Sequence, residues 1–290
     1  MSREFPLAGP SRIVEHRRTG PGWYVLRLHE PAIATASLPG RFVQIRCADG
    51  ESCDPLLRRP FSVYDADAAA GTYDILYTPV GRGTRWMEAL FAEGTRPCGD
   101  RPPSVDIEGP FGNAFSMPDP RDRVYLVGGG VGVAPLYFLA RRCFAAGASG
   151  PRPDMTLCMG ARTAAQLQGI AEFRKLPMRS EVSTDDGSEG FRGRVTELFL
   201  SLLEREADPA RVKVYGCGPQ AMNESLRAIA VERGIRCEIC LESLMGCGFG
   251  VCFACVAPIR KELGGEYLNR RICWEGPVFD ARLLHPGIDG

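Results

Sequence analysis

The sequence predicts a β-barrel plus α/β fold: a small antiparallel barrel, then a parallel doubly wound sheet, then a short C-terminal segment. Three changes in the spacing of apolar residues carry this prediction. Apolar residues alternate up to about residue 115, follow a strand–loop–helix rhythm from about 121 to 240, and lose regular spacing beyond 241. The corresponding domain boundaries are 1–118, 119–240 and 241–290.

The first region has the pattern of an antiparallel sheet. Alternating runs such as Tyr73, Ile75 and Tyr77 are short, and turn-forming pairs such as Pro39-Gly40 separate them. Short strands with frequent turns favour a small barrel or sandwich. Only Thr84–Phe91 has a clear helical pattern in this region.

The second region repeats a buried strand, a loop and a helix. Strands are expected at 123–127, 155–159, 181–184, 212–215 and 236–241, and helices at 135–145, 164–175, 195–206 and 220–233. This alternation implies right-handed crossovers and a parallel sheet with helices on both faces. The third region, in contrast, is expected to have little regular structure and is too short to bury a core of its own.

Composition excludes several classes of function. The chain has 35 Lys and Arg against 35 Asp and Glu, so no net positive charge attracts nucleic acid or an anionic membrane. Residues 1–18 contain no apolar leader core, and the most apolar stretch, 124–140, is interrupted by glycines and Pro135. We therefore expect a cytoplasmic protein that binds neither nucleic acid nor membrane.

The cysteines indicate a metal site. Of 12 cysteines, six lie within 237–273, whereas disulfide frameworks belong to short secreted domains. Cys247, Cys252 and Cys255 are separated by four and two residues, and Cys273 follows after seventeen more. This is the spacing of plant-type [2Fe-2S] ligands, and the surrounding glycines let backbone N–H groups approach the sulfurs.

Zinc is the main alternative for these thiols. Cys237 and Cys240 form a second C-x-x-C pair, but only eleven residues separate it from the pair Cys252 and Cys255, fewer than in zinc ribbons. On the predicted strand 236–241 the side chains of Cys237 and Cys240 would also face different ways. The spacing therefore favours the iron–sulfur cluster over zinc.

A second motif, Arg59-Pro60-Phe61-Ser62, enters a predicted strand after a polar loop. Its arginine can bind a diphosphate, its aromatic ring can face another ring, and its hydroxyl can bond a ring nitrogen. A solvated arginine and a core phenylalanine would explain the run equally well. The following Gly83-Thr84 leads into a helix, whose free N–H groups are a natural phosphate site.

A third motif is the glycine-rich loop 128–135 between a strand and a helix. It departs from the strict G-x-G-x-x-G pattern, because Val133 stands at the last glycine position. Its context still favours binding of a nucleotide pyrophosphate rather than a plain tight turn. Cys217-Gly218-Pro219 also lies between a predicted strand and a predicted helix, so it is expected at the same edge of the sheet as loop 128–135.

In this order, the motifs resemble the ferredoxin reductase-like flavoproteins. The tail Glu242–Val256, with Cys273 and the closing 275–279, resembles the electron-transfer subunit of NAD-linked dihydroorotate dehydrogenase. The resemblance implies that Arg59, Pro60, Phe61, Ser62, Gly83 and Thr84 bind FAD. It also implies that Gly129, Gly130 and Gly132 approach the NAD pyrophosphate, that Cys217, Gly218 and Pro219 lie near the nicotinamide, and that Cys247, Cys252, Cys255 and Cys273 hold the cluster.

The resemblance further implies a hetero-oligomer. A separate FMN-containing catalytic subunit would oxidise dihydroorotate for pyrimidine biosynthesis, and this chain would pass the electrons through [2Fe-2S] and FAD to NAD+. FAD suits the middle position because it exchanges either one or two electrons. Consistent with this division, the three histidines, His16, His29 and His285, lie outside the nucleotide motifs.

Two departures and two alternatives accompany this interpretation. Leu244 stands where the family run has an arginine, and the interval between Cys255 and Cys273 is a few residues longer than expected. The same cofactors would also serve a reductase subunit of another assembly, of the hydrogenase, sulfur-reducing or ferredoxin:NAD(P) type. In the non-enzymatic alternative, the cluster would only stabilise the fold of the C-terminal segment. Separately, Arg162 could contact a 2′-phosphate, so the choice between NAD and NADP stays open.

Overall fold

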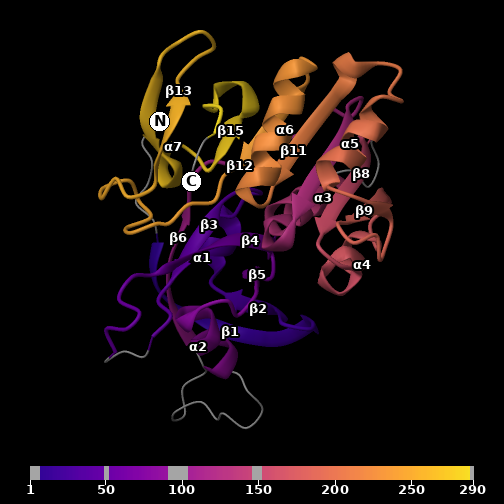
Figure 1. The fold of residues 1–290 in the computed structure, drawn as a ribbon. Helices are drawn as coiled ribbons and strands as arrows, with labels where there is room; N and C mark the ends of the chain where they lie inside the picture. Colours follow the sequence, from indigo (N-terminus) through magenta and orange to yellow (C-terminus); the bar gives the residue numbers. More distant parts are fainter. Residues whose placement is uncertain (1–6, 49–51, 91–103, 146–151, 288–290) are drawn as a thin grey trace.

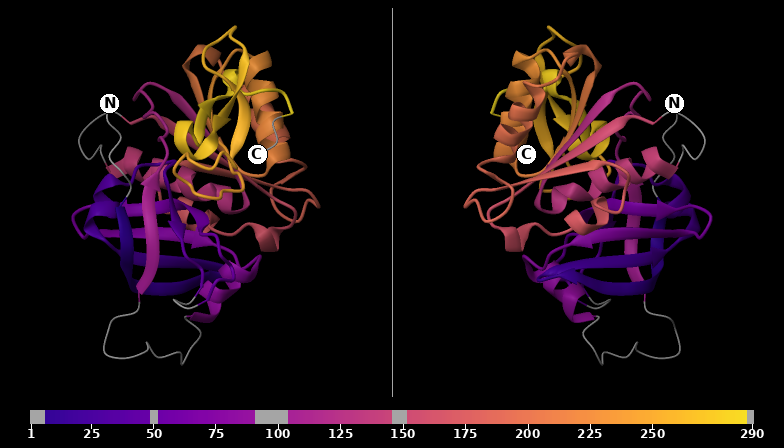
Figure 2. Two further views of the ribbon diagram at one scale, coloured as in Figure 1. Left: turned by 90° about the vertical axis from the view of Figure 1, so that its left-hand side faces the viewer. Right: turned by 90° about the vertical axis from the view of Figure 1, so that its right-hand side faces the viewer.

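The computed structural model describes residues 7–48, 52–90, 104–145 and 152–287, and the statements below concern these residues. Figure 1 shows two units, an indigo barrel and a magenta-to-orange α/β unit, with the yellow C-terminal segment beside the latter. Figure 2 shows the same arrangement from two sides.

The first unit is a closed barrel of six strands. These are β1 (Leu7–Gly20), β2 (Trp23–His29), β3 (Phe42–Ile45), β4 (Arg59–Asp67), β5 (Thr72–Tyr77) and β6 (Ser104–Phe111), in the order β1-β2-β5-β4-β3-β6. Every neighbouring pair is antiparallel, as the alternating pattern predicted. Leu26, Val43 and Ile45 point inward and are fully buried, so the strands enclose an apolar core.

Two helices accompany the barrel. Helix α2 (Arg82–Leu90) starts two residues before the predicted helix, whose last residue, Phe91, lies outside the described residues. The short helix α1 (Pro31–Ala36) was not predicted, because it spans only six residues. Its N-terminal signals are nevertheless regular: Pro31 occupies the first turn, and the carboxylate of Glu30 accepts the N–H of Ala32.

The second unit is a seven-stranded sheet in the order β10-β9-β8-β7-β11-β12-β15. Its strands are β7 (Arg123–Gly129), β8 (Asp154–Ala161), β9 (Arg179–Thr184), β10 (Phe191–Arg192), β11 (Val212–Cys217), β12 (Arg236–Cys240) and β15 (Val278–Asp280). All pairs are parallel except β12 with β15. Because β8 and β11 flank β7, the strand order reverses at β7, which creates a topological switch point.

Helices cover both faces of this sheet, as predicted. Helices α3 (Val133–Ala145) and α4 (Ile170–Phe173) pack on one face, whereas α5 (Val195–Leu203) and α6 (Gln220–Glu232) pack on the other. Residue parity along β7 explains the division, since Val124 and Leu126 face the first pair of helices and Tyr125 and Val127 face the second.

The predicted helix 164–175 is wrong as a continuous element. The structure has a 3₁₀ turn at Ala164–Gln166 and the four-residue helix α4, separated by Gly169 with a φ of +86°. Leu167, Ile170 and Phe173 are all buried. The apolar spacing that suggested one helix therefore comes from three residues that pack against the sheet without forming a continuous helix. The left-handed backbone at Gly169 breaks the hydrogen-bond ladder between them.

The C-terminal segment has more regular structure than its irregular spacing predicted, so this expectation is also corrected. It contains the hairpin β13 (Val256–Arg260) and β14 (Tyr267–Arg271), the short helix α7 (Ile272–Glu275), and β15. Strand β15 completes the sheet of the second unit. The boundaries 1–118, 119–240 and 241–290 therefore remain a prediction, because one strand of the last segment belongs to the preceding sheet.

Specific contacts join the units. The rings of Tyr64 on β4 and Tyr137 on α3 stack with centroids 4.5 Å apart, and Arg141 lies 3.1 Å from Asp65. The side chain of Asn113 donates to the carbonyl of Val278 at 2.8 Å and accepts the N–H of Val278 at 2.9 Å. The run Gly109–Asn113 thus ties the end of the barrel to the C-terminal segment.

Candidate functional site

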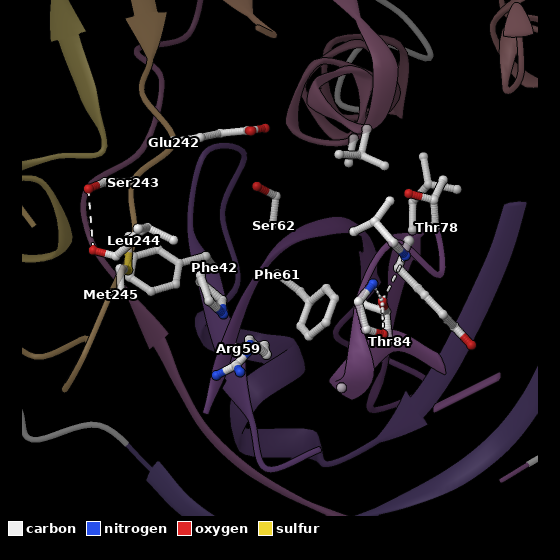
Figure 3. A pocket seen from close by; sticks show the side chains of 18 of the residues that line it. Phe42, Arg59, Phe61, Ser62, Thr78, Thr84, Glu242, Ser243, Leu244 and Met245 are labelled. Carbon is white, nitrogen blue, oxygen red and sulfur yellow. Dashed lines mark hydrogen bonds between the residues drawn. The ribbon is translucent and has the colours of Figure 1, made fainter. Parts of the chain in front are cut away.

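A cleft of about 640 Å³ lies where the barrel, the α/β unit and the C-terminal segment meet. Its walls contain Arg59, Pro60, Phe61, Ser62, Gly83 and Thr84 from the barrel unit, Val131 from the turn after β7, Ala134 from the start of α3, and residues 240–245 from the end of β12 onward. Figure 3 shows Leu244 and Met245 on one side of the cleft and Thr78 and Thr84 on the other. The structure therefore gathers every residue that the sequence assigned to FAD.

The two neighbouring arginines of the motif have different surroundings. Arg58 lies 2.8 Å from Asp106 and 3.0 Å from Glu108, both carboxylates of β6. Arg59 lines the cleft, is half-buried and donates to the carbonyl of Leu57 at 2.6 Å, but makes no ion pair within the described ranges. A half-buried guanidinium without a carboxylate partner suits an anionic ligand.

Phe61 is part of an aromatic wall of the cleft. It meets Tyr77 edge to face with centroids 6.3 Å apart, and Tyr77 stacks on Tyr24 at 5.5 Å. The hydroxyl of Tyr77 is 2.8 Å from Nε2 of His16, and burial raises the pKa of this tyrosine. Phe61 thus both packs against the barrel core and faces the cleft, so the two interpretations of this residue are compatible.

The loop before α2 is held closed by Thr84. Its hydroxyl accepts the N–H groups of Val80 at 2.9 Å and Gly81 at 3.1 Å. Gly83 is required for space, since a Cβ there would lie 2.9 Å from Cβ of Cys47 and 3.4 Å from Cγ of Arg59. The absence of a side chain at Gly83 lets the start of α2 lie against the cleft arginine.

The two nucleotide loops lie side by side, as predicted, because Cys217 of β11 pairs with Gly128 of β7. The glycines have different roles. A Cβ on Gly132 would lie 2.6 Å from the carbonyl oxygen of Cys217, so this glycine allows the loops to touch each other. Gly130 has a φ of +57°, and no heavy atom in the described part of the chain lies within 4 Å of its Cβ position, so its backbone is open to a ligand.

The remaining predicted residues of these loops lie close together. Gly129 approaches the ring of Pro219, with 3.5 Å between its Cβ position and Cδ, and the Cβ position of Gly218 lies 3.1 Å from N of Gly129. Cys217 is fully buried and its thiol hydrogen-bonds that of Cys240, a residue that lines the cleft. The nucleotide loops and the cleft therefore meet at the ends of β7, β11 and β12.

Sequence reasoning missed Glu242 as a site residue. Its side chain lines the cleft two residues after β12 and is accessible to solvent, but the surrounding walls exclude part of the water around its carboxyl and raise its pKa. The only signal was its position at the carboxyl end of a parallel strand, where ligands of α/β sheets bind.

The four predicted cluster ligands come together as two pairs. Sγ of Cys252 accepts the N–H of Cys247 at 3.4 Å, and Sγ of Cys247 accepts the N–H of Cys252 at 3.4 Å. Cys273 donates its N–H to Sγ of Cys255 at 3.4 Å. Two pairs of thiols fit a group with two irons, because each iron of such a cluster takes two cysteine ligands.

Backbone groups around these thiols favour negative charge. Burial raises the pKa of Cys247, but N–H groups of Cys252, Phe249 and Val251 outweigh this effect and lower it. The hydrogen bond between the thiols of Cys255 and Cys273 lowers the pKa of Cys255 and raises that of Cys273. Thiolates are the form that binds iron, so the residues present fit the cluster that the spacing predicts.

A clamp holds the cysteine loop against the rest of its segment. Arg271 donates to the carbonyl of Gly250 at 2.8 Å and pairs with Glu275 at 2.7 Å, and its guanidinium lies 4.9 Å from the ring centroid of Phe253. Gly250 packs on Trp274, whose Cβ and Cγ both lie 3.0 Å from the Cβ position of the glycine.

The zinc alternative is not supported by this arrangement. Cys237 and Cys240 belong to separate core clusters on opposite faces of β12, as the sequence indicated. In the parts of the chain that the structure describes, no three His, Cys, Asp or Glu side chains converge on a single ion.

None of the described helices has the length and apolar character needed to cross a lipid bilayer.

Comparison with known proteins agrees with the architecture. Residues 126–228 match the oxidoreductase NAD-binding domain family, and residues 242–285 match the iron–sulfur cluster binding domain of dihydroorotate dehydrogenase B. A solved structure described as an NADH-dependent reduced ferredoxin–NADP oxidoreductase superposes with a TM-score of 0.76 at 27% identity, covering 95% of this chain and 90% of that one. The ferredoxin reductase of carbazole 1,9a-dioxygenase shares the fold at 19% identity and a TM-score of 0.62, over 79% of this chain and 67% of that one.

The fold and the site thus define an oxidoreductase of the ferredoxin reductase-like class with an additional iron–sulfur segment. Curated relatives specify the class further. The electron transfer subunit of dihydroorotate dehydrogenase B (NAD(+)) from Desulforamulus reducens is 35% identical over 262 residues, 90% of this chain and 92% of the relative. The Geobacillus kaustophilus subunit is 37% identical over 283 residues, 97% and 98% respectively. The chain belongs to this family of electron transfer subunits.

Proposed function

We propose that this chain links dihydroorotate oxidation on a partner subunit to reduction of NAD+. The supporting observation is the continuity of the two cofactor sites. Residues 241–245 line the cleft, and Cys247, the first cluster ligand, follows two residues after Met245. One short stretch of chain therefore forms part of both sites and fixes their separation.

The cleft residues have distinct parts in this function. Arg59 would neutralise the FAD diphosphate, Gly83 and Thr84 would shape the adjacent helix start, and Phe61 and Ser62 would border the flavin ring. When bound, FAD can exchange two electrons with a nicotinamide and one electron with an iron–sulfur cluster. The protein supplies the binding, orientation and exclusion of water.

NAD would bind across the loops after β7 and β11. Gly130 offers open backbone for the pyrophosphate, while Cys217, Gly218 and Pro219 lie where the sheet meets the cleft. Val131 of the loop after β7 and Ala134 at the start of α3 also line the cleft, so a nucleotide here would lie against a flavin in the cleft.

The partner would be an FMN-containing catalytic subunit, and the assembly a hetero-oligomer. Leu244, Val251 and Phe253 are 88%, 70% and 57% exposed, and all lie within ten residues of Cys247. Large apolar side chains that surround a redox site at the surface are typical of a protein interface. The cytoplasmic location remains a prediction from the sequence.

A second candidate function is a reductase subunit of a ferredoxin–NAD(P) type complex. The likeness to the NADH-dependent reduced ferredoxin–NADP oxidoreductase structure over 95% of the chain favours it. The two functions differ in the partner and the electron donor, whereas the predicted cofactors of this chain are the same.

Reconstitution distinguishes them. We expect the purified chain to contain one FAD and one [2Fe-2S] cluster and to oxidise NADH with an artificial acceptor. NAD+-linked oxidation of dihydroorotate should appear only after a co-encoded FMN subunit is added. Activity of the chain alone on dihydroorotate, or failure of the FMN subunit to bind it, would contradict the proposal.

A further inference from the structure

Strand β3 is buried on both sides, which is unusual for a barrel strand. Val43 and Ile45 point into the barrel core, so Phe42 and Gln44 point outward. Both outward residues are nevertheless covered, Phe42 with 3% and Gln44 with 0% of its surface exposed. The core cluster around Phe42 includes Cys255 and Ile272, so the C-terminal segment forms this cover.

Gln44 lies directly against the loop of the first cysteine pair. A Cβ on Gly248 would lie 2.1 Å from Nε2 of Gln44, 2.8 Å from Cδ and 2.9 Å from Cγ. Gly248 also has a φ of +79°, and it follows Cys247 in the chain. The glutamine amide therefore occupies the space that any larger residue at position 248 would need.

The amide of Gln44 has unmet hydrogen-bonding capacity. Neither its Nε2 nor its Oε1 has a hydrogen-bond partner, and no other side chain in the described ranges has two such buried atoms. A buried primary amide without partners is costly, so such groups are retained where a partner is bound. The loop beside Gln44 carries Cys247 and Cys252, whose thiols form one of the two pairs that fit the cluster.

Resting on the cluster assignment proposed above, we infer that Gln44 is a positioning residue for the cluster. Its amide N–H donates a hydrogen bond to the sulfurs held by the Cys247–Cys252 loop. Hydrogen bonds to cluster sulfurs stabilise the additional negative charge of the reduced form and raise the reduction potential.

The same residue connects the two cofactor sites. Gln44 pairs in register with Pro60 of the FAD motif, and Phe42, two residues earlier, lines the cleft. Strand β3 therefore carries Phe42, which lines the cleft, and Gln44, which contacts the cysteine loop, on the same outward face. The barrel thereby fixes the cysteine loop relative to the flavin cleft.

Redox titration of the purified full chain with its cofactors, monitored by electron paramagnetic resonance, tests this inference. Gln44→Leu preserves the approximate size and removes the donor, so the cluster potential should fall. The expected shift is up to about a tenfold change in the one-electron equilibrium, or ~59 mV. Gln44→Met likewise removes the donor while keeping an unbranched side chain of similar length, so its potential should fall by a similar amount.

Thr156→Val is the matched control. Thr156 on β8 is 3% exposed and its hydroxyl has no hydrogen-bond partner among the described residues, but it lies in the interior of the α/β sheet. Its variant should keep the wild-type potential. If the glutamine variants retain a full cluster at the wild-type potential, the inference is wrong, even when they lower the melting temperature.

A double-mutant cycle covers the case in which a glutamine variant loses its cluster. Gly248→Ala should lose most of its acid-labile sulfide, because the new methyl group meets the glutamine amide and because a φ of +79° is strained for alanine. Adding Gln44→Ala should recover part of that loss. Equal losses in both backgrounds would show that the two residues do not touch and would overturn the inference. Wild-type protein without iron and sulfide would instead overturn the proposed function.

Discussion

The flavin cleft and the cysteine segment are adjacent, but they are built in different ways. Cleft residues such as Arg59 and Ser62 stand on β4, a strand hydrogen-bonded on both sides within a closed barrel. The cysteine loop 246–254 contains no helix or strand, and turns, the Arg271 clamp and contacts with the barrel hold it. The cleft is therefore organised before its ligand binds, whereas the loop depends on what its thiols hold.

Loss of one cluster ligand should have the largest effect, and this effect should be confined to the cluster in the cysteine segment. Cys273→Ser should abolish the cluster, because it removes one thiol of the Cys255 pair. Iron, acid-labile sulfide and the visible spectrum measure this. FAD content should remain near that of the wild type, since strand pairing within the closed barrel holds β3 and β4 when the cluster is lost.

Cys237→Ala is the control for that substitution. Cys237 is buried on β12 and belongs to the core of the α/β unit, so its variant should keep the cluster spectrum. A cluster that survives Cys273→Ser but not Cys237→Ala would show that our ligand set is wrong.

Breaking the cleft should have the converse effect. Arg59→Ala removes a charge-assisted contact with the diphosphate, so FAD affinity should fall by roughly 1.5–3 kcal/mol, about 10- to 100-fold. Equilibrium dialysis of FAD measures the change, and cluster content should be preserved.

The neighbouring arginine provides the matched control. Arg58 is paired with Asp106 and Glu108, so Arg58→Ala should lower the melting temperature while FAD affinity changes little. Equal losses of FAD affinity in the two variants would show that the ion pairs of Arg58 do not keep it from contributing to FAD binding as much as Arg59 does.

A smaller effect should follow from loosening the contact between barrel and C-terminal segment. Asn113→Ala removes three side-chain hydrogen bonds to Glu275 and Val278, so we expect a loss of about 1–3 kcal/mol in stability. Denaturant unfolding measures it, and limited proteolysis should cut the C-terminal segment first. Asn269→Ala, at an exposed position on β14, should change neither.

The smallest effect concerns pH. The cleft walls exclude part of the water around Glu242, although its side chain remains accessible to solvent, and this raises the pKa of its carboxyl above the ordinary value of 4.5. The folded form therefore holds this proton more tightly than the unfolded chain does. The stability of the wild type should therefore decrease as pH rises through the raised value, because the charged carboxylate is disfavoured in the fold.

Glu242→Gln removes this charge, so it should be more stable than the wild type at neutral pH. The difference should shrink as pH falls toward 4.5. Urea unfolding of both proteins between pH 5 and 8 tests the sign. A variant that is less stable throughout this range would show that the carboxylate makes a favourable contact in the folded cleft.

Local chemistry explains which features were predictable. The alternation in the barrel, the buried strands of the sheet and the glycine-rich loop after β7 follow from period and turn residues, and the structure confirms them. The continuous helix at 164–175 failed because three buried apolar residues at helical spacing also serve as anchors around a left-handed Gly169. Spacing cannot distinguish the two, since both bury the same residues.

The sequence by itself determined the chemistry of the ligands. Four cysteines at the spacing 247, 252, 255 and 273, and an arginine before an aromatic residue and a hydroxyl, are local patterns that specify which atoms are offered. Only the tertiary structure decided which of two adjacent arginines pairs with carboxylates among the described residues, and that Glu242 lies in the cleft. It also placed Gln44, about two hundred residues earlier in the chain, against Gly248. These contacts join residues that are distant in sequence, and their positions follow from how whole strands pack, which no local pattern encodes.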